Sequence, residues 1–286
     1  MTDTADTADT ALVLGGGGLT GVGWEIGILH GLARAGVDLT DADLLVGTSA
    51  GSVVAAQVRS GVLTLPELYE RQLAAPEGEI AAELGLTVVL RYARAALTAR
   101  TPEAYGRRIG RMALAARTAD ESTRRAVIAG RLLSHDWPER PLTVTAVDAL
   151  TGELRALDAA SGVPLVDAVA ASCAVPLVWP AVTLDGRRHI DGGMHSSANA
   201  HLAAGYRRVV VIAPLTLGGG PLATPAAQAA ALTARGARVL LITPDQAARK
   251  AFGRNALDPA RRAPAARAGL AQAPAHVERA AALWAQ

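Results

Sequence analysis

The residues with the clearest chemical potential form the segment Gly47-Thr48-Ser49-Ala50-Gly51. An apolar run over 43–48 predicts a strand before it, and a helix is expected directly after it. A serine between small residues at such a strand-to-helix turn is typical of a nucleophile, because the sharp turn leaves no room for neighbouring side chains. The alternative is a serine that only caps the helix. The flanking elements favour a catalytic Ser49, with Gly47 and Gly51 forming the nucleophile elbow.

A second predicted strand-to-helix junction carries four consecutive glycines at 15–18. The backbone N–H groups of such a loop can surround an anion, because no side chains are in the way. The glycine spacing also fits a dinucleotide-binding fingerprint, with Asp38 as the acidic partner of the ribose. A dinucleotide site gives no role to a nucleophile, whereas acyl transfer needs both a nucleophile and an oxyanion hole. We therefore expect the amides of Gly16, Gly17 and Gly18 to form an oxyanion hole.

A candidate base follows a predicted hairpin strand, in the segment Asp191-Gly192-Gly193. A carboxylate at this position can reach into a cleft, and it can accept a proton from a serine if loss of water raises its pKa. A histidine base is the alternative, because His189 shares a strand face with Asp191 and His195 follows within four residues. Surface positions in the hairpin or loop are the commoner role for both histidines. Asp191 is therefore the predicted base.

Other candidates for chemistry are weaker. Cys173 lies among small residues before a proline, so we expect a buried filler rather than a nucleophile. No group of His, Cys and carboxylate residues has the spacing of a metal site. The sequence therefore predicts neither a metal nor a cofactor.

The elements that must position these residues alternate between strands and helices. Strands are predicted over 11–14, 43–48, 142–147, 154–157, 182–184, 187–190, 207–213 and 237–243, and helices over 24–35, over 53–59, after Pro164, between the last two strands and after Pro274. The long segment 65–133 shows helical spacing and no strand pattern, which predicts a helical insert. Strands that alternate with helices imply an α/β class with a largely parallel, covered central sheet. We expect a single domain over 11–286 after a disordered tail over 1–10.

Composition excludes several other classes. The 28 basic and 26 acidic residues nearly cancel to a net charge of +2, which argues against a general nucleic-acid binder. One cysteine cannot form an internal disulfide, and the tail over 1–10 carries three Asp and no basic residue, unlike the start of a signal peptide. The apolar, uncharged stretch 168–184 is short for a membrane span and contains two prolines. A cytoplasmic protein is expected.

The order of these motifs resembles that of bacterial patatin-like phospholipases, in the lysophospholipase-like acyl hydrolase superfamily. The resemblance runs from Ala11 through the glycine loop, the Ser49 segment, residues 170–176 and the Asp191 segment, roughly two-thirds of the chain. It implies a three-layer α/β/α fold and a Ser–Asp dyad without an essential histidine: Ser49 as nucleophile, Asp191 as base and the 16–18 backbone as oxyanion hole. The chain departs from the family at Thr20, where the family usually has Arg or Lys. We expect that departure to alter substrate preference or rate rather than to abolish activity.

These observations predict a serine acyl hydrolase of the phospholipase A or lysophospholipase type, which cleaves lipid esters through an acyl-enzyme. Two alternatives stay open. The same acyl-enzyme can pass its acyl group to an alcohol or thiol, as in an acyltransferase. A lipid- or nucleotide-binding regulator can also keep the fold and lose turnover.

The helical insert has an unusual charge. The range 91–131 holds ten Arg against three acidic residues, a local net charge of +7. A solvated helix face is the ordinary explanation for such a run. The alternative is peripheral contact with an anionic membrane. The sequence gives no indication of the oligomeric state.

Overall fold

The computed structural model describes residues 9–75, 79–216 and 218–284. Its centre is a sheet with the strand order β5-β6-β3-β2-β1-β7-β8, and β4 pairs with β3 off this path. The strands are β1 (Thr10–Leu14), β2 (Leu44–Thr48), β3 (Leu142–Asp148), β4 (Leu154–Leu157), β5 (Val182–Leu184), β6 (Arg187–Asp191), β7 (Arg208–Ile212) and β8 (Arg238–Ile242). The five strands β3, β2, β1, β7 and β8 run parallel, whereas the hairpin strands β4, β5 and β6 pair antiparallel at one end of the sheet.

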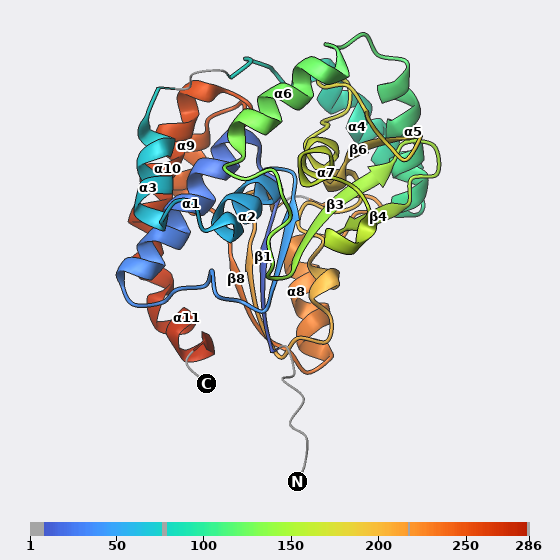
Figure 1. The fold of residues 1–286 in the computed structure, drawn as a ribbon. Helices are drawn as coiled ribbons and strands as arrows, with labels where there is room; N and C mark the ends of the chain where they lie inside the picture. The colour runs from blue at the N-terminus through green and yellow to red at the C-terminus, as the bar shows by residue number, and fades with distance from the viewer. Residues whose placement is uncertain (1–8, 76–78, 217, 285–286) are drawn as a thin grey trace.

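Helices cover both faces of the sheet, so the predicted three-layer, largely parallel α/β fold is confirmed (Figure 1). The helices are α1 (Gly18–Arg34), α2 (Ala50–Ser60), α3 (Leu65–Leu73), α4 (Leu86–Thr98), α5 (Pro102–Leu114), α6 (Glu121–Arg131), α7 (Leu165–Ser172), α8 (Pro225–Ala234), α9 (Gln246–Phe252), α10 (Arg262–Gln272) and α11 (Val277–Trp284). The helices α1, α2 and α7 pack on one face, and α8 packs on the other. The helices α4 and α5 cover the antiparallel end.

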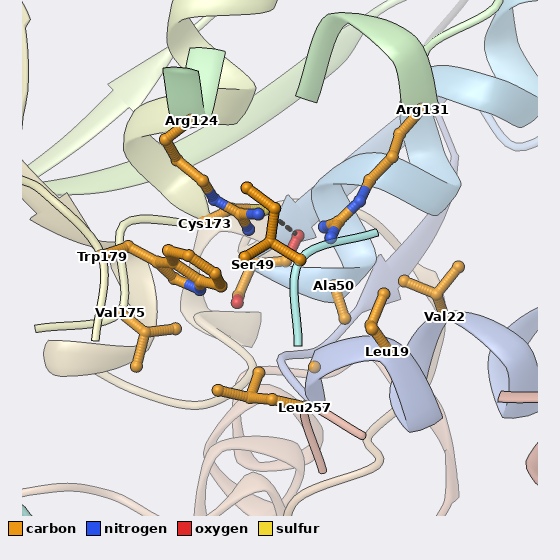
Figure 2. A pocket seen from close by; sticks show the side chains of 12 residues that line it. Leu19, Val22, Ser49, Ala50, Arg124, Arg131, Cys173, Val175, Trp179 and Leu257 are labelled. Carbon is orange, nitrogen blue, oxygen red and sulfur yellow. Dashed lines mark hydrogen bonds between the residues drawn. The ribbon is translucent and has the colours of Figure 1, made fainter. Parts of the chain in front are cut away.

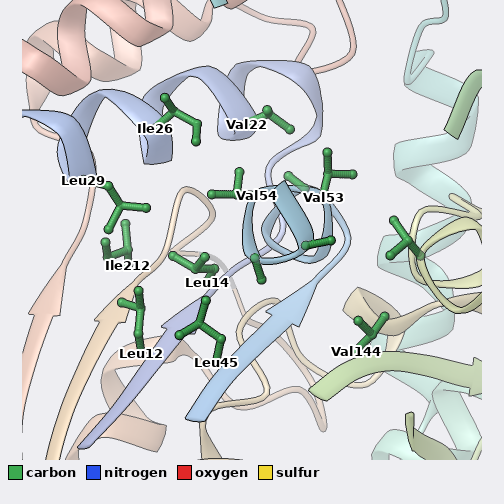
Figure 3. Close-up of a cluster of buried hydrophobic side chains, with 14 of the residues drawn as sticks. Leu12, Leu14, Val22, Ile26, Leu29, Leu45, Val53, Val54, Val144 and Ile212 are labelled. Atoms are coloured by element: carbon green, nitrogen blue, oxygen red, sulfur yellow. The ribbon is translucent and has the colours of Figure 1, made fainter. Parts of the chain in front are cut away.

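Side-chain alternation explains why the central strands are apolar throughout. Leu12 and Leu14 of β1 point toward α1 and α2, together with residues of β2 and β7 (Figure 3). The intervening Ala11 and Val13 belong to the core on the opposite face, which includes Leu232 of α8. Because both faces are buried, a run without polar alternation is stable as a strand here.

The helix α1 lies unusually close to α10. A Cβ placed on Gly27 of α1 would lie 2.2 Å from the carbonyl oxygen of Ala266, and one placed on Gly269 of α10 would lie 2.3 Å from that of Trp24. Neither position has room for a side chain. The two helices therefore pack backbone to backbone at this contact.

The helix α1 also begins earlier than predicted, at Gly18 rather than Trp24. Two hydrogen bonds hold its first turn. The Thr20 N–H donates to the distant Ala256 carbonyl at 3.2 Å, and the Thr20 hydroxyl donates to the carbonyl of the N-cap residue Gly17 at 3.1 Å. These contacts offset the low helix propensity of the glycines. The glycine loop is therefore shorter than the sequence indicated, and it leads directly into the N-terminus of a helix.

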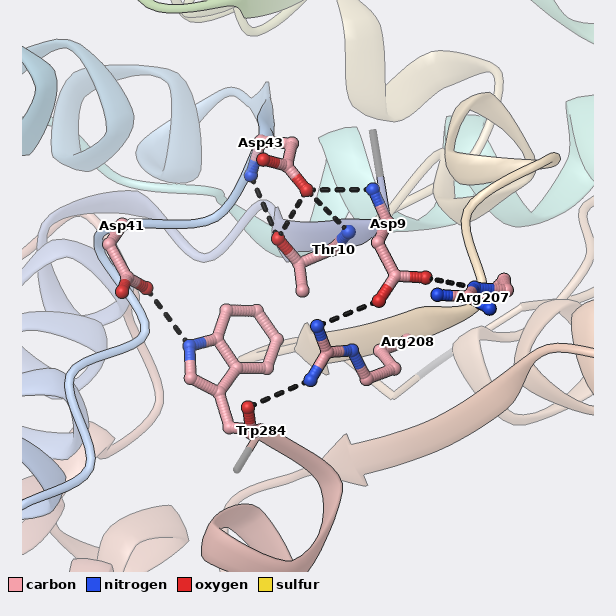
Figure 4. A network of polar contacts seen from close by, with 7 residues as sticks. All are labelled: Asp9, Thr10, Asp41, Asp43, Arg207, Arg208 and Trp284. Atoms are coloured by element: carbon pink, nitrogen blue, oxygen red, sulfur yellow. Dashed lines mark hydrogen bonds and ion pairs between the residues drawn. The ribbon is translucent and has the colours of Figure 1, made fainter. Parts of the chain in front are cut away.

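The predicted disordered N-terminal tail is wrong at its last two residues, Asp9 and Thr10, which lie where the central strand β1 begins. Thr10 is the first residue of β1, and Asp9 forms ion pairs with Arg207 and Arg208 (Figure 4). The Asp43 carboxylate accepts hydrogen bonds from the amides of Asp9 and Thr10 at 2.7 and 2.8 Å. Asp9 and Thr10 therefore belong to the folded domain, at the end of the sheet where β1 begins. Residues 1–8 of the predicted tail lie outside the described residues.

Between β2 and β3, the described residues form α2 to α6 and no strand, so the helical insert is confirmed. In the part of the chain that the structure describes, no helix combines the length and the apolarity needed to cross a bilayer.

Candidate active site

Ser49 lies in a strained turn between β2 and α2. Its φ of 52° and ψ of −117° place a non-glycine residue in a region that L-amino acids rarely adopt. A Cβ on Gly51 would lie 2.1 Å from the Leu14 carbonyl oxygen, and one on Gly47 would lie 2.5 Å from the Ser52 Cα. Both neighbours must therefore be glycine for the chain to make this turn.

Three hydrogen bonds with side chains hold the turn in place, besides the one from the Ser52 N–H to the Ser49 carbonyl. The Ser49 N–H donates to Ser172 Oγ at 2.9 Å, while the Ser49 carbonyl accepts from Ser52 Oγ at 2.6 Å and from Cys173 Sγ at 3.3 Å. The prediction that Cys173 is buried is confirmed. Burial raises the pKa of its thiol to about 11, so the sulfur stays protonated and serves as a donor to the turn.

Asp191 is the last residue of β6 and meets Ser49 directly. The Ser49 hydroxyl donates to Asp191 Oδ2 at 2.7 Å, and the Gly193 N–H donates to Oδ1 at 2.7 Å. The Asp191 side chain is buried, and this burial raises the pKa of the carboxyl from 3.8 to about 6, against the opposing effect of the two hydrogen bonds. A Cβ on Gly192 would lie 2.3 Å from Thr145 Oγ1, so this glycine lets the segment pass close to β3.

Asn199 joins the elements that carry these two residues, and sequence reasoning did not single it out. It is fully buried, with a φ of 51°, and its side-chain amide donates to Thr48 Oγ1 at 3.1 Å and to the Gly192 carbonyl at 3.2 Å. One contact reaches the residue before Ser49 and the other the residue after Asp191. Asn199 is therefore suited to fix the separation of the two side chains.

The two histidines considered as alternative bases form hydrogen bonds with other residues. His189 Nδ1 lies 3.1 Å from the Arg187 carbonyl, and His195 Nδ1 lies 3.0 Å from Asn199 Oδ1. Neither has a hydrogen bond to Ser49 or Asp191. His189 is 1 % exposed, contrary to the surface position expected for it, because the hairpin that carries it is packed into the sheet edge next to β3.

The structure shows which backbone amides are available for the predicted oxyanion hole. The Gly16 N–H donates to the Ser197 carbonyl at 2.7 Å and is therefore not an available donor, although a Cβ on Gly16 would lie 3.5 Å from the Ser49 Cβ. Within the described residues, no acceptor is found for the amides of Gly17 and Gly18 or for that of Ala50. Gly18 and Ala50 are the first residues of α1 and α2, whose N-termini carry partial positive charge.

The cavity at Ser49 is narrow. It measures about 30 Å³ and adjoins a second cavity of about 490 Å³, with Leu19, Val22 and Arg131 lining both. Only a few water molecules fit beside the serine itself. Figure 2 shows the guanidinium groups of Arg124 and Arg131 above Ser49, with Trp179 beside Arg124. Sequence reasoning counted both arginines in the basic insert, with a solvated face or a membrane contact as its alternatives, and the structure turns both inward.

The residues brought together here match a known family. A family model described as patatin-like phospholipase matches residues 12–204. The chain belongs to the patatin-like phospholipase family. This membership supports a lipid acyl hydrolase, and the mostly parallel sheet covered on both faces agrees with a patatin-like fold.

Two solved structures resemble this patatin-like phospholipase. The crystal structure of VipD from Legionella pneumophila has a TM-score of 0.48 and 11 % identity, with 95 % of this chain and 67 % of that chain covered. The crystal structure of the type III effector protein ExoU has a TM-score of 0.41 and 13 % identity, with 96 % of this chain and 53 % of that chain covered, so this chain spans about half the length of ExoU. A comparison with curated protein sequences finds no match. Among the described residues, no three His, Cys, Asp or Glu side chains form a group that could hold a metal ion.

Proposed function

We propose that this patatin-like phospholipase is a serine acyl hydrolase that cleaves lipid esters with Ser49 as nucleophile and Asp191 as base. The observation that carries the proposal is the 2.7 Å hydrogen bond from Ser49 Oγ to a buried carboxyl whose pKa is raised to about 6. A base with a pKa in this range is ionised at pH 7 and still accepts a proton during reaction.

The proposed reaction has two halves. Asp191 takes the hydroxyl proton while Ser49 Oγ attacks the ester carbonyl carbon, and the amides of Gly17, Gly18 and Ala50 donate to the resulting oxyanion. The tetrahedral intermediate then expels the lipid alcohol, which receives the proton from Asp191 and leaves an acyl-serine. Water attacks this ester with Asp191 again as base, releasing the fatty acid and restoring the serine.

The test uses a fluorophosphonate probe and a p-nitrophenyl ester. The wild-type protein should be labelled at Ser49 and should hydrolyse the ester, whereas Ser49→Ala should lose labelling and about 10⁴-fold or more of its rate. The matched control is Ser122→Ala, which removes an exposed hydroxyl. Turnover like that of the wild type in folded Ser49→Ala would overturn the assignment, and a folded wild type that is never labelled would favour a non-catalytic regulator.

The competing acyltransferase activity is distinguished by its products. Glycerol added to the ester assay intercepts the acyl-enzyme if the enzyme transfers acyl groups to alcohols. A hydrolase should release free fatty acid as the main product at all glycerol concentrations. Dominant formation of a glycerol ester would replace the hydrolase proposal with acyl transfer.

We also propose that the insert makes peripheral contact with anionic membranes. Leu86, Leu90 and Leu97 are 73 %, 59 % and 84 % exposed and follow one face of α4, and α4 packs against α5, whose arginines include Arg107 and Arg108. Exposed apolar side chains beside positive charge suit a bilayer surface that carries anionic lipid, where each basic residue contributes about 1 kcal/mol.

Vesicle binding tests this contact. Arg107, Arg108 and Arg111 changed together to Gln should weaken binding to anionic vesicles, and added salt should weaken wild-type binding steeply. The control changes Arg249 and Lys250 of α9, away from α4 in Figure 1. Equal binding of the wild type to neutral and anionic vesicles would leave the arginines as a solvated face.

A further inference from the structure

Arg124 contacts no reacting group in the proposed reaction, although its charge lowers the pKa of Asp191. It projects from α6 into the cavity at Ser49 and is only 3 % exposed. Its guanidinium lies 4.0 Å from the centre of the Trp179 ring. Its Nε and Nη1 atoms are buried and have no hydrogen-bond acceptor among the described residues. A buried cation with unsatisfied donors is costly unless something pairs with it.

The other arginines of α6 differ from Arg124 in this respect. Arg125 is exposed and pairs with Asp167, and Arg131 pairs with Glu79. The Arg124 guanidinium carbon lies over the Trp179 ring, and a cation–π contact of this kind gives the N–H groups no hydrogen-bond acceptor. Burial lowers the pKa of Arg124 to about 10, so the side chain still carries its charge at neutral pH. Packing alone therefore does not account for this residue.

We propose that Arg124 forms an anion subsite that recognises a phosphate group on the ester substrate, so that the enzyme prefers phosphate-bearing lipids to neutral acylglycerols. This inference rests on the proposed function and specifies its substrate class. A guanidinium binds phosphate through two parallel N–H donors, and such charge-assisted bonds are stronger than neutral ones.

The position of Arg124 agrees with this role. Arg124 and Ser49 line the same cavity, and the glycine loop has no charged residue from 15 to 24 that could serve instead. In a glycerophospholipid, the phosphate is separated from the acyl ester by the short glycerol backbone. An anion site beside the nucleophile therefore fits a substrate that carries both groups, and the adjoining cavity of about 490 Å³ provides further room.

Binding is measured in the Ser49→Ala background, so that the result does not depend on turnover. Calorimetry compares a lysophosphatidic acid, a monoacylglycerol with the same acyl chain, and inorganic phosphate. Arg124→Gln should raise the Kd of the lysophosphatidic acid about 10- to 100-fold, and at least tenfold more than it raises that of the monoacylglycerol. Arg125→Gln, which removes the same charge from the exposed side of α6, should leave the preference for phosphate intact.

Each other outcome decides against the subsite. An equal rise in Kd for both lipids would mean that Arg124 binds the oxyanion or only packs in the cavity. Tight binding of inorganic phosphate without a preference for the phosphorylated lipid would make a free anion the ligand. If Arg124→Gln does not fold, Arg124→Lys keeps the charge and should retain part of the preference for the phosphorylated lipid. A Ser49→Ala protein with Arg124 intact that binds both lipids equally would overturn the proposal. Failure of the hydrolase proposal appears separately, as absent labelling of Ser49.

Discussion

Replacing Asp191 with Asn should stabilise the protein while it removes activity. The folded-state pKa is about 6 and the unfolded value is 3.8, so ionisation of this carboxyl in the folded protein costs about 2.2 pKa units. At about 1.36 kcal/mol per unit, the penalty reaches about 3 kcal/mol at pH 7. Asn has the same shape, carries no charge and can still accept from the Gly193 N–H. We therefore expect the free energy of unfolding to rise by about 2 to 3 kcal/mol at pH 7.5.

The sign of this effect depends on pH in a defined way. Because folding raises the pKa of Asp191, the penalty is absent below the unfolded pKa of 3.8 and complete above the folded pKa of about 6. The gain in Asp191→Asn should therefore grow between pH 4 and pH 6 and then level off. Urea unfolding at pH 4, 5, 6 and 7.5 measures it.

Asp148 supplies a control of opposite sign. Its carboxylate accepts from the amides of Leu150 and Thr151 and pairs with Arg187, and these contacts hold the pKa of Asp148 below its ordinary value despite the opposing effect of burial. Asp148→Asn should therefore lose stability at pH 7.5. No stabilisation of Asp191→Asn at pH 7.5, or the same gain at pH 4, would refute the reasoning.

The same pKa predicts the pH dependence of hydrolysis. Asp191 must be ionised to accept the proton, so kcat/KM should fall as the pH drops through about 6. Arg124 is the charged group that lowers the pKa of Asp191. Cys173 and Tyr92 also lie near Asp191, but they stay neutral in this range because burial and the Asp191 charge raise their own pKa values. An acid limb near pH 4 in the wild type would contradict the assignment of Asp191 as a desolvated base.

Three further substitutions test the site. Gly51→Ala should cost about 3 kcal/mol or more in unfolding free energy, measured by urea, because its Cβ meets the Leu14 carbonyl at 2.1 Å; stability like that of the wild type would show that the turn is not constrained. His189→Ala and His195→Ala should keep kcat within about tenfold, and a loss as large as that of Asp191→Asn in a folded variant would make that histidine the base. Asn199→Ala should lower kcat more than tenfold and cost about 2 kcal/mol, since it breaks buried bonds on both sides of the site; unchanged kcat would remove its positioning role.

The motifs were readable from the sequence because their constraints are local. Gly47 and Gly51 must be glycine for the turn at Ser49 to form, so the short segment itself indicates the elbow. The strands were readable because the parallel strands β1, β2, β3 and β7 are buried on both faces. The start of α1 was not readable, since Gly18 begins a helix only with support from Ala256, far away in the chain.

The remaining features of the site depend on contacts between distant segments. The Gly16 amide is occupied by the Ser197 carbonyl, which no local pattern indicates. Arg124 was counted as one of ten arginines in a basic insert, and only the packing of α6 over the site turns it inward. Asn199 was equally hidden, because its role comes from a side-chain NH2 group that lies within hydrogen-bond distance of four acceptors, three of them on distant strands or the Asp191 segment or next to Ser49, an arrangement that exists only in the folded chain.

The close contact of α1 with α10 makes the glycine loop dependent on residues that carry none of the motifs. The family model ends at residue 204, yet β7, β8 and α10 follow it, and β7 pairs with β1 directly before the loop. The Gly15 N–H donates to the Ile212 carbonyl, and the Thr20 N–H donates to the Ala256 carbonyl. A fragment ending at 204 would hold every proposed catalytic residue but neither support for the loop. Substitutions in the last third of the chain should therefore be able to change the reaction rate without touching a motif.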